Sequence, residues 1–244
     1  MMSKDHNMER SQLLGFARIA ETTYNDPGKH EFAKLGYQVV KYFDRNGAQA
    51  YLIQNRECRI LTFRGTEVSQ PSDVIADVRA VRRKEPTGNV HRGFRGELDK
   101  IWHDILRELE QGSLPLYITG HSLGAAMATL AASRLGPSKV QALVTFGSPR
   151  VGNRRFVANL FVDHYRVINN NDAVTKVPLW IMGYRHHGQP VYLNYHGEIR
   201  DLTVWQRVKD MLRSRRRAMA KWQFFKGVYD HLMAHYIEKL QKGE

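Results

Sequence analysis

The pentapeptide GHSLG at residues 120–124 constrains the fold of this chain more than any other part of its sequence. An apolar segment that predicts a short strand, 116–119, precedes it, and an alanine-rich segment that predicts a helix, 123–135, follows it. The G-x-S-x-G pattern at such a junction is typical of a sharp turn that exposes a serine hydroxyl above a parallel sheet. We therefore expect Ser122 to be a nucleophile, with an ordinary glycine-serine turn as the alternative.

Strand and helix patterns alternate along most of the chain. Helical spacing marks 9–24, 94–109, 123–135 and 156–161, and strand patterns mark 37–43, 48–54, 58–63, 116–119, 140–146 and 165–168. This alternation predicts an α/β fold with a largely parallel sheet covered by helices. The first three strands, with a turn at Asn46-Gly47, are expected to form an antiparallel extension. The length of 244 residues, 42% of them hydrophobic, suits a single domain, 1–244.

Composition narrows the chemistry and the partners. A single cysteine, Cys58, excludes an intramolecular disulfide and an all-cysteine metal site. The 37 Lys and Arg residues outnumber the 24 Asp and Glu residues by 13, which predicts an anionic partner or surface. No apolar leader is visible, and the longest apolar stretch, 125–132, is too short to span a bilayer. We expect a cytoplasmic or peripheral membrane location, with export still open.

Four motifs follow one another along the chain: FRGT at 63–66, HRGF at 91–94, GHSLGAA at 120–126 and FGSPRVGN at 146–153. In this order they resemble the class 3 lipases, a family of fungal triacylglycerol lipases and bacterial relatives within the α/β-hydrolase superfamily. The resemblance runs from about residue 37 to residue 237. It implies an α/β-hydrolase fold, with a central mostly parallel sheet flanked by helices and a short lid helix. It also implies a serine carboxylic ester hydrolase, a lipase or esterase of acylglycerols or related lipid esters, that needs no cofactor or metal.

Two backbone N–H groups are candidates for an oxyanion hole. Leu123 begins the predicted helix, where N–H groups have no helical acceptor and favour an anion. The resemblance implies Thr66 as the second donor, because the last residue of the FRGT motif closes the oxyanion hole in that family.

A serine nucleophile of this superfamily is followed along the chain by an acid and then a histidine. Of the aspartates after Ser122, which are Asp163, Asp172, Asp201, Asp210 and Asp230, Asp172 is the best candidate. It follows the strand at 165–168, and the NNND loop that contains it resembles the family's motif at the catalytic aspartate. Such a cluster also forms turns, and both interpretations can hold together.

His231 and His235 compete for the role of base, because histidines four residues apart share one face of a helix. Two arguments favour His231: it precedes Tyr236 by five residues, as in many members of the family, and Asp230 is a candidate cap that would place it in an exposed first turn. The pair can also suggest zinc, but no HExxH pattern accompanies it. The remaining histidines that we considered are expected to be structural or exposed: His91, His121, His186 and His187.

Two further segments bear on lipid contact. Residues 67–90 correspond to the lid of the resembling family, and Val74, Ile75, Val78 and Val81 predict a narrow apolar helix face there. Arginines and a lysine between 79 and 84 crowd its end, and a surface helix packed on the core is an equal alternative. The segment 204–226 predicts a basic amphipathic helix, with eight Lys or Arg residues and one acid between 207 and 226.

The basic segment has three interpretations. It can be a helical insert that covers the domain, which we favour, or it can lie transiently on an anionic membrane or lipid interface. Nucleic acid is not expected as a partner, because no nucleic-acid-binding module accompanies the charge. Three alternatives to the lipase stay open: a phospholipase A1, a short-chain esterase, and a lipase-like lipid-binding protein without catalysis.

Overall fold

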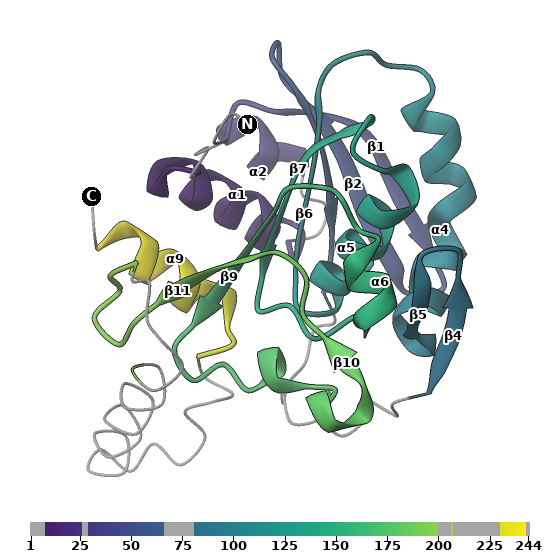
Figure 1. The fold of residues 1–244 in the computed structure, drawn as a ribbon. Helices are drawn as coiled ribbons and strands as arrows, with labels where there is room; N and C mark the ends of the chain where they lie inside the picture. Colours follow the sequence, from purple (N-terminus) through teal and green to yellow (C-terminus); the bar gives the residue numbers. More distant parts are fainter. Residues whose placement is uncertain (1–7, 26–28, 66–80, 200–205, 207–229, 243–244) are drawn as a thin grey trace, which may run out of the picture.

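The computed structural model describes residues 8–25, 29–65, 81–199, 206 and 230–242 (Figure 1). Thr66, most of the predicted lid helix and, apart from residue 206, the basic segment 204–226 lie outside these residues. The expectations for them therefore stay predictions, as do the domain boundaries. In the part of the chain that is described, no helix is long and apolar enough to cross a membrane.

A seven-stranded sheet forms the centre of the fold, in the order β1-β2-β3-β6-β7-β9-β11. Five strands run parallel: β3 (Arg59–Phe63), β6 (Leu116–His121), β7 (Val140–Phe146), β9 (His164–Asn169) and β11 (Gln189–Leu193). β1 (Gln38–Arg45) and β2 (Ala48–Gln54) extend the sheet in antiparallel pairing beside β3. The predicted parallel sheet and its antiparallel extension are confirmed, whereas β11 is an additional strand.

The turn between β1 and β2 is the one that the sequence predicts. Arg45 pairs with Ala48, so Asn46 and Gly47 alone form the connection. Both residues have positive φ, 51° and 83°. A two-residue turn with this backbone matches the twist of paired strands, which is why an Asn-Gly pair fixes the register here.

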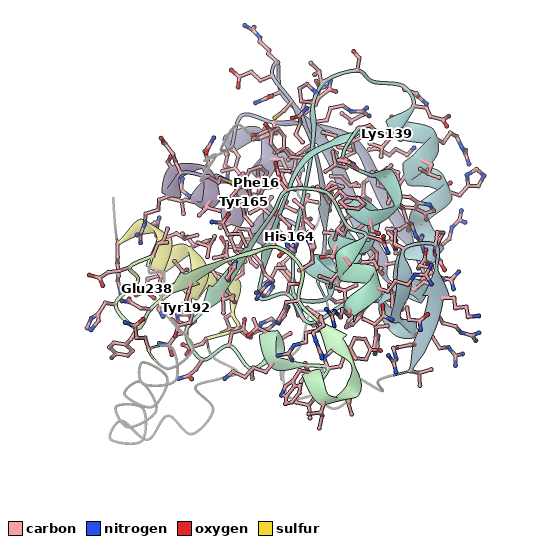
Figure 2. All side chains as sticks on the ribbon, in the orientation of Figure 1. Phe16, Lys139, His164, Tyr165, Tyr192 and Glu238 are labelled. Carbon is pink, nitrogen blue, oxygen red and sulfur yellow. The ribbon has the colours of Figure 1, made fainter. Side chains whose placement is uncertain are left out.

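Helices cover both faces of the sheet (Figure 1). On one face lie α4 (Arg92–Leu109), α5 (Leu123–Leu135) and α6 (Arg154–Ala158), and on the other α1 (Arg10–Thr22), α2 (Lys29–Lys34) and α9 (Met233–Gln241). Figure 2 shows Phe16 of α1 and Tyr165 of β9, which belong to the core on the α1 and α9 side. α6 begins two residues before the prediction, because the side chain of Asn153 accepts from the Phe156 N–H and caps it.

A second, four-stranded sheet was not predicted. Its order is β10-β8-β5-β4, with bounds Tyr184–Arg185, Gly152–Asn153, Gly88–His91 and Arg82–Glu85. The expectation that Arg82, Arg83 and Lys84 crowd the end of a helix is wrong, because they lie on β4. Pairing with β5, which itself pairs with β8 across a long stretch of sequence, decides this segment, and local spacing does not report such a partner.

Candidate active site

Ser122 lies in the sharp turn between β6 and α5. Its backbone has φ 56° and ψ −123°, a conformation that L-residues rarely adopt. A Cβ at Gly120 would lie 2.5 Å from the Gly124 carbonyl oxygen, and one at Gly124 would lie 2.2 Å from the Phe63 carbonyl oxygen. A larger residue at either position would therefore collide with the backbone. The two glycines let the strained turn close against β3, and the surrounding packing holds the strain.

The side chain of Ser122 is buried. Ser122 is only 1% exposed, and its backbone N–H donates to the Phe146 carbonyl 3.1 Å away. Its Oγ forms no hydrogen bond within the described residues. A buried hydroxyl without a partner costs free energy, so its retention points to a group that is held ready for a ligand.

Asp172 and His231 form a buried pair although 59 residues separate them. His231 Nδ1 lies 2.9 Å from Asp172 Oδ2, and the two side chains are 3% and 0% exposed. Because the carboxylate accepts, Nδ1 carries the proton and Nε2 keeps its lone pair. His231 Nε2 also has no partner within the described part of the chain. The pair therefore has the tautomer that a general base needs.

The carboxylate of Asp172 accepts three hydrogen bonds. Oδ2 accepts from His231 and from the Tyr236 hydroxyl, and Oδ1 accepts from the Val174 N–H. Burial by itself raises a carboxyl pKa, but the neighbouring His231 and the hydrogen bonds from His231 and Tyr236 hold the pKa of Asp172 below its ordinary value. Asp172 is therefore an anion at neutral pH. The role of Tyr236 was missed by the sequence analysis, in which it served only as a marker for His231.

Two side chains fix the turn that carries His231. The Asn169 side-chain amide donates to the Asp230 carbonyl at 2.9 Å, and His121 Nε2 lies 2.7 Å from the His231 carbonyl. The expectation that Asp230 caps the final helix is wrong. α9 begins at Met233, and its N-cap residue, Leu232, has no side-chain cap. His231 thus sits in a buried turn before the helix, held from β6 and β9 rather than by helical geometry.

His121, within the elbow, is structural as expected, and its geometry is specific. Its ring stacks on the His231 ring with centroids 4.5 Å apart, and its Nδ1 lies 2.7 Å from the Tyr24 hydroxyl. Burial and the neighbouring His231 lower the pKa of His121 to about 3. The neutral ring then donates from Nε2 to the carbonyl and accepts at Nδ1 from Tyr24.

Gly147 lies directly against the Asp172–His231 pair. Its φ is +57°, and a Cβ at this position would lie 2.8 Å from Asp172 Oδ2 and from two atoms of the His231 ring. The FGSPR segment that contains it therefore forms one wall of the pair. The sequence shows a glycine directly after a buried strand at this position. The contact of Gly147 with Asp172 and His231 could not be predicted from that pattern.

The other histidines that the sequence analysis considered do not contact Asp172 in the described part of the chain, apart from His121. His235 Nδ1 lies 3.3 Å from Glu238 Oε2 on α9, so His231 and His235 are directed to different carboxylates. His91 caps α4, where its Nδ1 accepts from the Phe94 N–H. His186 and His187 are largely shielded from solvent, and His187 Nδ1 lies 3.1 Å from His164 Nδ1. In the described ranges, no group of three or more His, Cys, Asp or Glu residues is arranged to hold a metal.

One of the two candidate oxyanion donors lies in the described part. Leu123 is the first residue of α5, where a backbone N–H has no helical acceptor. A cavity of about 510 Å³ adjoins Leu123 and is also lined by Gly65 and Met127, with Gln49, Arg64 and Lys100 among its polar residues. Space for part of a bound molecule is therefore present beside the serine turn. Thr66 follows Gly65 directly but lies outside the described residues.

Comparisons with known proteins agree with this geometry. The family described as lipase (class 3) matches residues 60–182, half of the chain. A secreted mono- and diacylglycerol lipase 1 of Fusarium solani is 34% identical over 124 residues, which cover 47% of this chain and 37% of that protein. A chloroplastic phospholipase A(1) of Arabidopsis thaliana is 42% identical over 96 residues, which cover 35% of this chain and 22% of that protein.

The fold also matches solved structures. Lipase II from Rhizopus niveus superposes with a TM-score of 0.69 at 24% identity, covering 75% of this chain and 80% of that one. This likeness confirms the predicted fold class, a mostly parallel sheet flanked by helices. Both curated relatives named above are matched over less than half of their own length.

Proposed function

Because this chain belongs to the class 3 lipase family, we propose that it hydrolyses carboxylic esters of lipids, with Ser122 as nucleophile and His231 as general base. Asp172 orients His231 and stabilises its charged form. One observation carries the proposal: the buried Asp172–His231 pair leaves His231 Nε2 and Ser122 Oγ as polar atoms without a partner in the described part of the chain. His121, the residue before Ser122, stacks on the His231 ring, and an unpaired base and an unpaired hydroxyl are what a nucleophile and its activating histidine require.

Acylation follows from this arrangement. Ser122 Oγ attacks the ester carbonyl carbon while its proton passes to His231 Nε2, and the carbonyl electrons move to the oxygen. The Leu123 N–H, with Thr66 as the second donor, stabilises this oxyanion. When the tetrahedral intermediate collapses, the bond to the alcohol oxygen breaks and His231 gives the proton to the leaving alcohol. The acyl group stays on Ser122 as an ester.

Deacylation repeats the steps with water. Water gives one proton to His231 Nε2 and attacks the acyl carbon, and collapse returns the proton to Ser122 Oγ and releases a carboxylic acid. The anionic Asp172 lowers the energy of the imidazolium in both halves of the cycle, which is why its low pKa matters. No metal or cofactor enters this scheme.

Acylglycerols and related lipid esters are the proposed substrates. The Fusarium relative is named a mono- and diacylglycerol lipase, and the Arabidopsis relative is named a phospholipase A(1), which supports phospholipid as the second candidate. The Fusarium relative is also named as secreted, so export is favoured over the cytoplasmic location expected from the sequence. Contact of the segment 204–226 with an anionic interface stays a prediction.

Hydrolysis of p-nitrophenyl esters across a short-to-long acyl series tests the proposal. Ser122→Ala and His231→Gln are each expected to lower kcat by about a million-fold, as loss of the triad serine or histidine does. His235→Gln is the matched control, because its Nδ1 lies 3.3 Å from Glu238 Oε2 on α9 and not beside Asp172, and it is expected to keep the rate.

The profile of the wild-type protein separates the substrates. A preference for long acyl chains supports the lipase, and release of the sn-1 fatty acid from phosphatidylglycerol vesicles supports the phospholipase. A wild-type protein that is inactive on the whole series, or a Ser122→Ala variant that keeps its activity, contradicts the proposal and leaves a lipid-binding protein.

A further inference from the structure

Four consecutive large apolar residues are exposed on one turn of this molecule. They are Leu179, Trp180, Ile181 and Met182, which form and precede the 3-10 helix η2 (Trp180–Met182). Trp180 is 63% exposed and Ile181 is 68% exposed. Isolated apolar side chains at a surface need no explanation, but a contiguous group of this size marks an interaction site.

The turn is held rigidly by its backbone. The Met182 N–H donates to the Leu179 carbonyl and the Gly183 N–H donates to the Trp180 carbonyl. Arg185 Nη1 also donates to the Trp180 carbonyl, at 2.7 Å. Tyr184, which follows, is fully buried and pairs with Asn153 in the second sheet. The exposure of the four side chains is therefore a built feature, because the backbone that carries them is anchored on both sides.

Arg82 of β4 lies beside this turn, and Arg83 and Lys84 follow it along the same strand. The Arg82 guanidinium lies 5.9 Å from the centre of the Tyr184 ring, and its Nη1 lies 3.1 Å from where a Cβ on Gly183 would be. Arg82, Arg83 and Lys84 are all exposed on β4. In the described ranges, no carboxylate forms an ion pair with any of these three residues. Among the described residues, the Arg82 charge beside the apolar turn therefore has no carboxylate that competes with an anionic partner.

We propose that the turn 179–182 and the basic edge of β4 together dock this protein on an anionic lipid bilayer. Tryptophan is enriched at membrane interfaces, where an apolar ring and an N–H group are both satisfied, and each nearby Lys or Arg adds attraction to anionic headgroups. The occupant is a lipid surface rather than a folded partner, because four consecutive apolar side chains are exposed beside a cationic one, on a turn at the lower edge of the fold (Figure 1).

The turn 179–182 lies at the same edge of the sheet as the candidate site. The inference that docking brings lipid to Ser122 rests on the proposed function. The turn begins seven residues after Asp172, on the same loop that follows β9. Loops after the carboxyl ends of parallel strands meet at one edge of the sheet, the edge at which the serine turn also lies. A bilayer bound at residues 179–182 would therefore face the same edge of the sheet as Ser122. The turn 179–182 lies outside the segment 67–90, where the lid was expected, whereas Arg82, Arg83 and Lys84 lie within that segment.

Vesicle binding tests the proposal without hydrolysis. The full chain carrying Ser122→Ala is sedimented with vesicles of phosphatidylcholine alone, or of phosphatidylcholine with about 30 mol % phosphatidylglycerol. Trp180→Ser combined with Ile181→Ser is expected to weaken binding to the anionic vesicles at least about tenfold, since two apolar side chains no longer leave water. Arg83→Gln combined with Lys84→Gln is expected to weaken binding about tenfold at low salt and less at high salt.

Phe161→Ser is the matched control. Phe161 is 70% exposed, but it precedes β9 at the amino ends of the parallel strands, the opposite edge of the sheet. It is expected to bind vesicles as the parent protein does. The thermal unfolding midpoints of all variants are compared with the parent, so that a loss of binding is not taken from an unfolded chain.

Several results would overturn the proposal. One is that the Trp180→Ser and Ile181→Ser double variant binds anionic vesicles as tightly as the parent protein does. The others are that the parent binds neutral and anionic vesicles equally well, or that Phe161→Ser loses as much binding as the double variant. A wild-type dimer that the double variant converts to a monomer would instead assign the turn to contact between two copies. Because Ser122→Ala carries no nucleophile, a failure of ester hydrolysis in the wild-type protein would leave the docking result standing.

Discussion

The hydroxyl of Tyr236 lies 2.5 Å from Asp172 Oδ2, the same carboxylate oxygen that accepts the hydrogen bond from His231. Burial and the negative charge of Asp172 raise the pKa of Tyr236 well above its ordinary value, so the hydroxyl stays a donor. The Asn169 N–H in turn donates to the Tyr236 oxygen at 3.2 Å. A chain of donors from β9 through Tyr236 thus stabilises the same carboxylate oxygen that orients the histidine.

Removal of this hydroxyl is the first prediction. Tyr236→Phe is expected to lower kcat about tenfold with little change in KM, because a charge-assisted hydrogen bond contributes about 1.5–3 kcal/mol and acts here through Asp172. The kcat and KM of ester hydrolysis, measured for the variant and the wild-type protein, check it. Tyr117→Phe is the control, because no hydrogen bond of the Tyr117 hydroxyl occurs within the described residues; an equal loss there would refute the assignment.

Gly147 provides a second prediction. Gly147→Ala places a Cβ 2.8 Å from Asp172 Oδ2 and from the His231 ring, so the pair must move apart. We expect activity to fall about 100-fold or more, since a displacement of about 1 Å costs that much in a positioned site. Gly136→Ala is the matched control. Its φ of +76° carries similar backbone strain, but no atom lies within 4 Å of the added carbon, so only stability should decrease. Equal activity losses in the two variants would show that strain alone is responsible.

The elbow gives a third prediction. Gly124→Ala brings a Cβ to 2.2 Å from the Phe63 carbonyl oxygen, which must separate α5 from β3. Both stability and activity should fall, with the free energy of unfolding reduced by about 1–3 kcal/mol as in overpacked cores. Gly96→Ala, on α4 with open space around the added carbon, should instead raise the free energy of unfolding by about 0.5–1 kcal/mol. Urea unfolding of the two variants distinguishes these outcomes.

The buried histidines predict how stability depends on pH. The pKa of His121 is lowered to about 3, and burial also lowers the pKa values of His164 and His186. In the unfolded chain these groups bind protons near pH 6.5, so between that pH and the folded pKa the unfolded state holds more protons. The contribution of these histidines to the free energy of unfolding is therefore complete above pH 6.5, and it decreases as the pH falls towards about 4.

Asp172 adds to this loss only at lower pH. Its pKa is held below the ordinary value of 3.8, so its contribution is complete above that pH and is lost as the pH falls through its folded pKa. The change in the urea unfolding midpoint between about pH 8 and pH 4 should thus come from protonation of the buried histidines. His121→Gln should flatten the profile; a wild-type protein whose stability does not change over this range would contradict the prediction.

Local sequence was sufficient for much of the fold. The bounds of α5, β2 and β7 agree with the prediction, because apolar periodicity, an Asn-Gly turn and flanking glycines act within a few residues. β4 and β11 were not predicted. Each depends on a strand partner brought by the tertiary fold, β5 held by β8 in one case and β9 in the other. Pairing energy comes from those partners and leaves little trace in local composition.

The same division applies to the candidate site. The sequence determined which residue types could react: the strained Ser122, an acidic loop after β9 and two candidate histidines, since motif spacing reports local backbone geometry. Only the tertiary structure decided that His231 and not His235 meets Asp172, that Tyr236 shares the carboxylate, and that His121 and Asn169 hold the turn. These contacts join residues between 59 and 110 positions apart, and their geometry follows from how helices and strands pack, which no local pattern encodes.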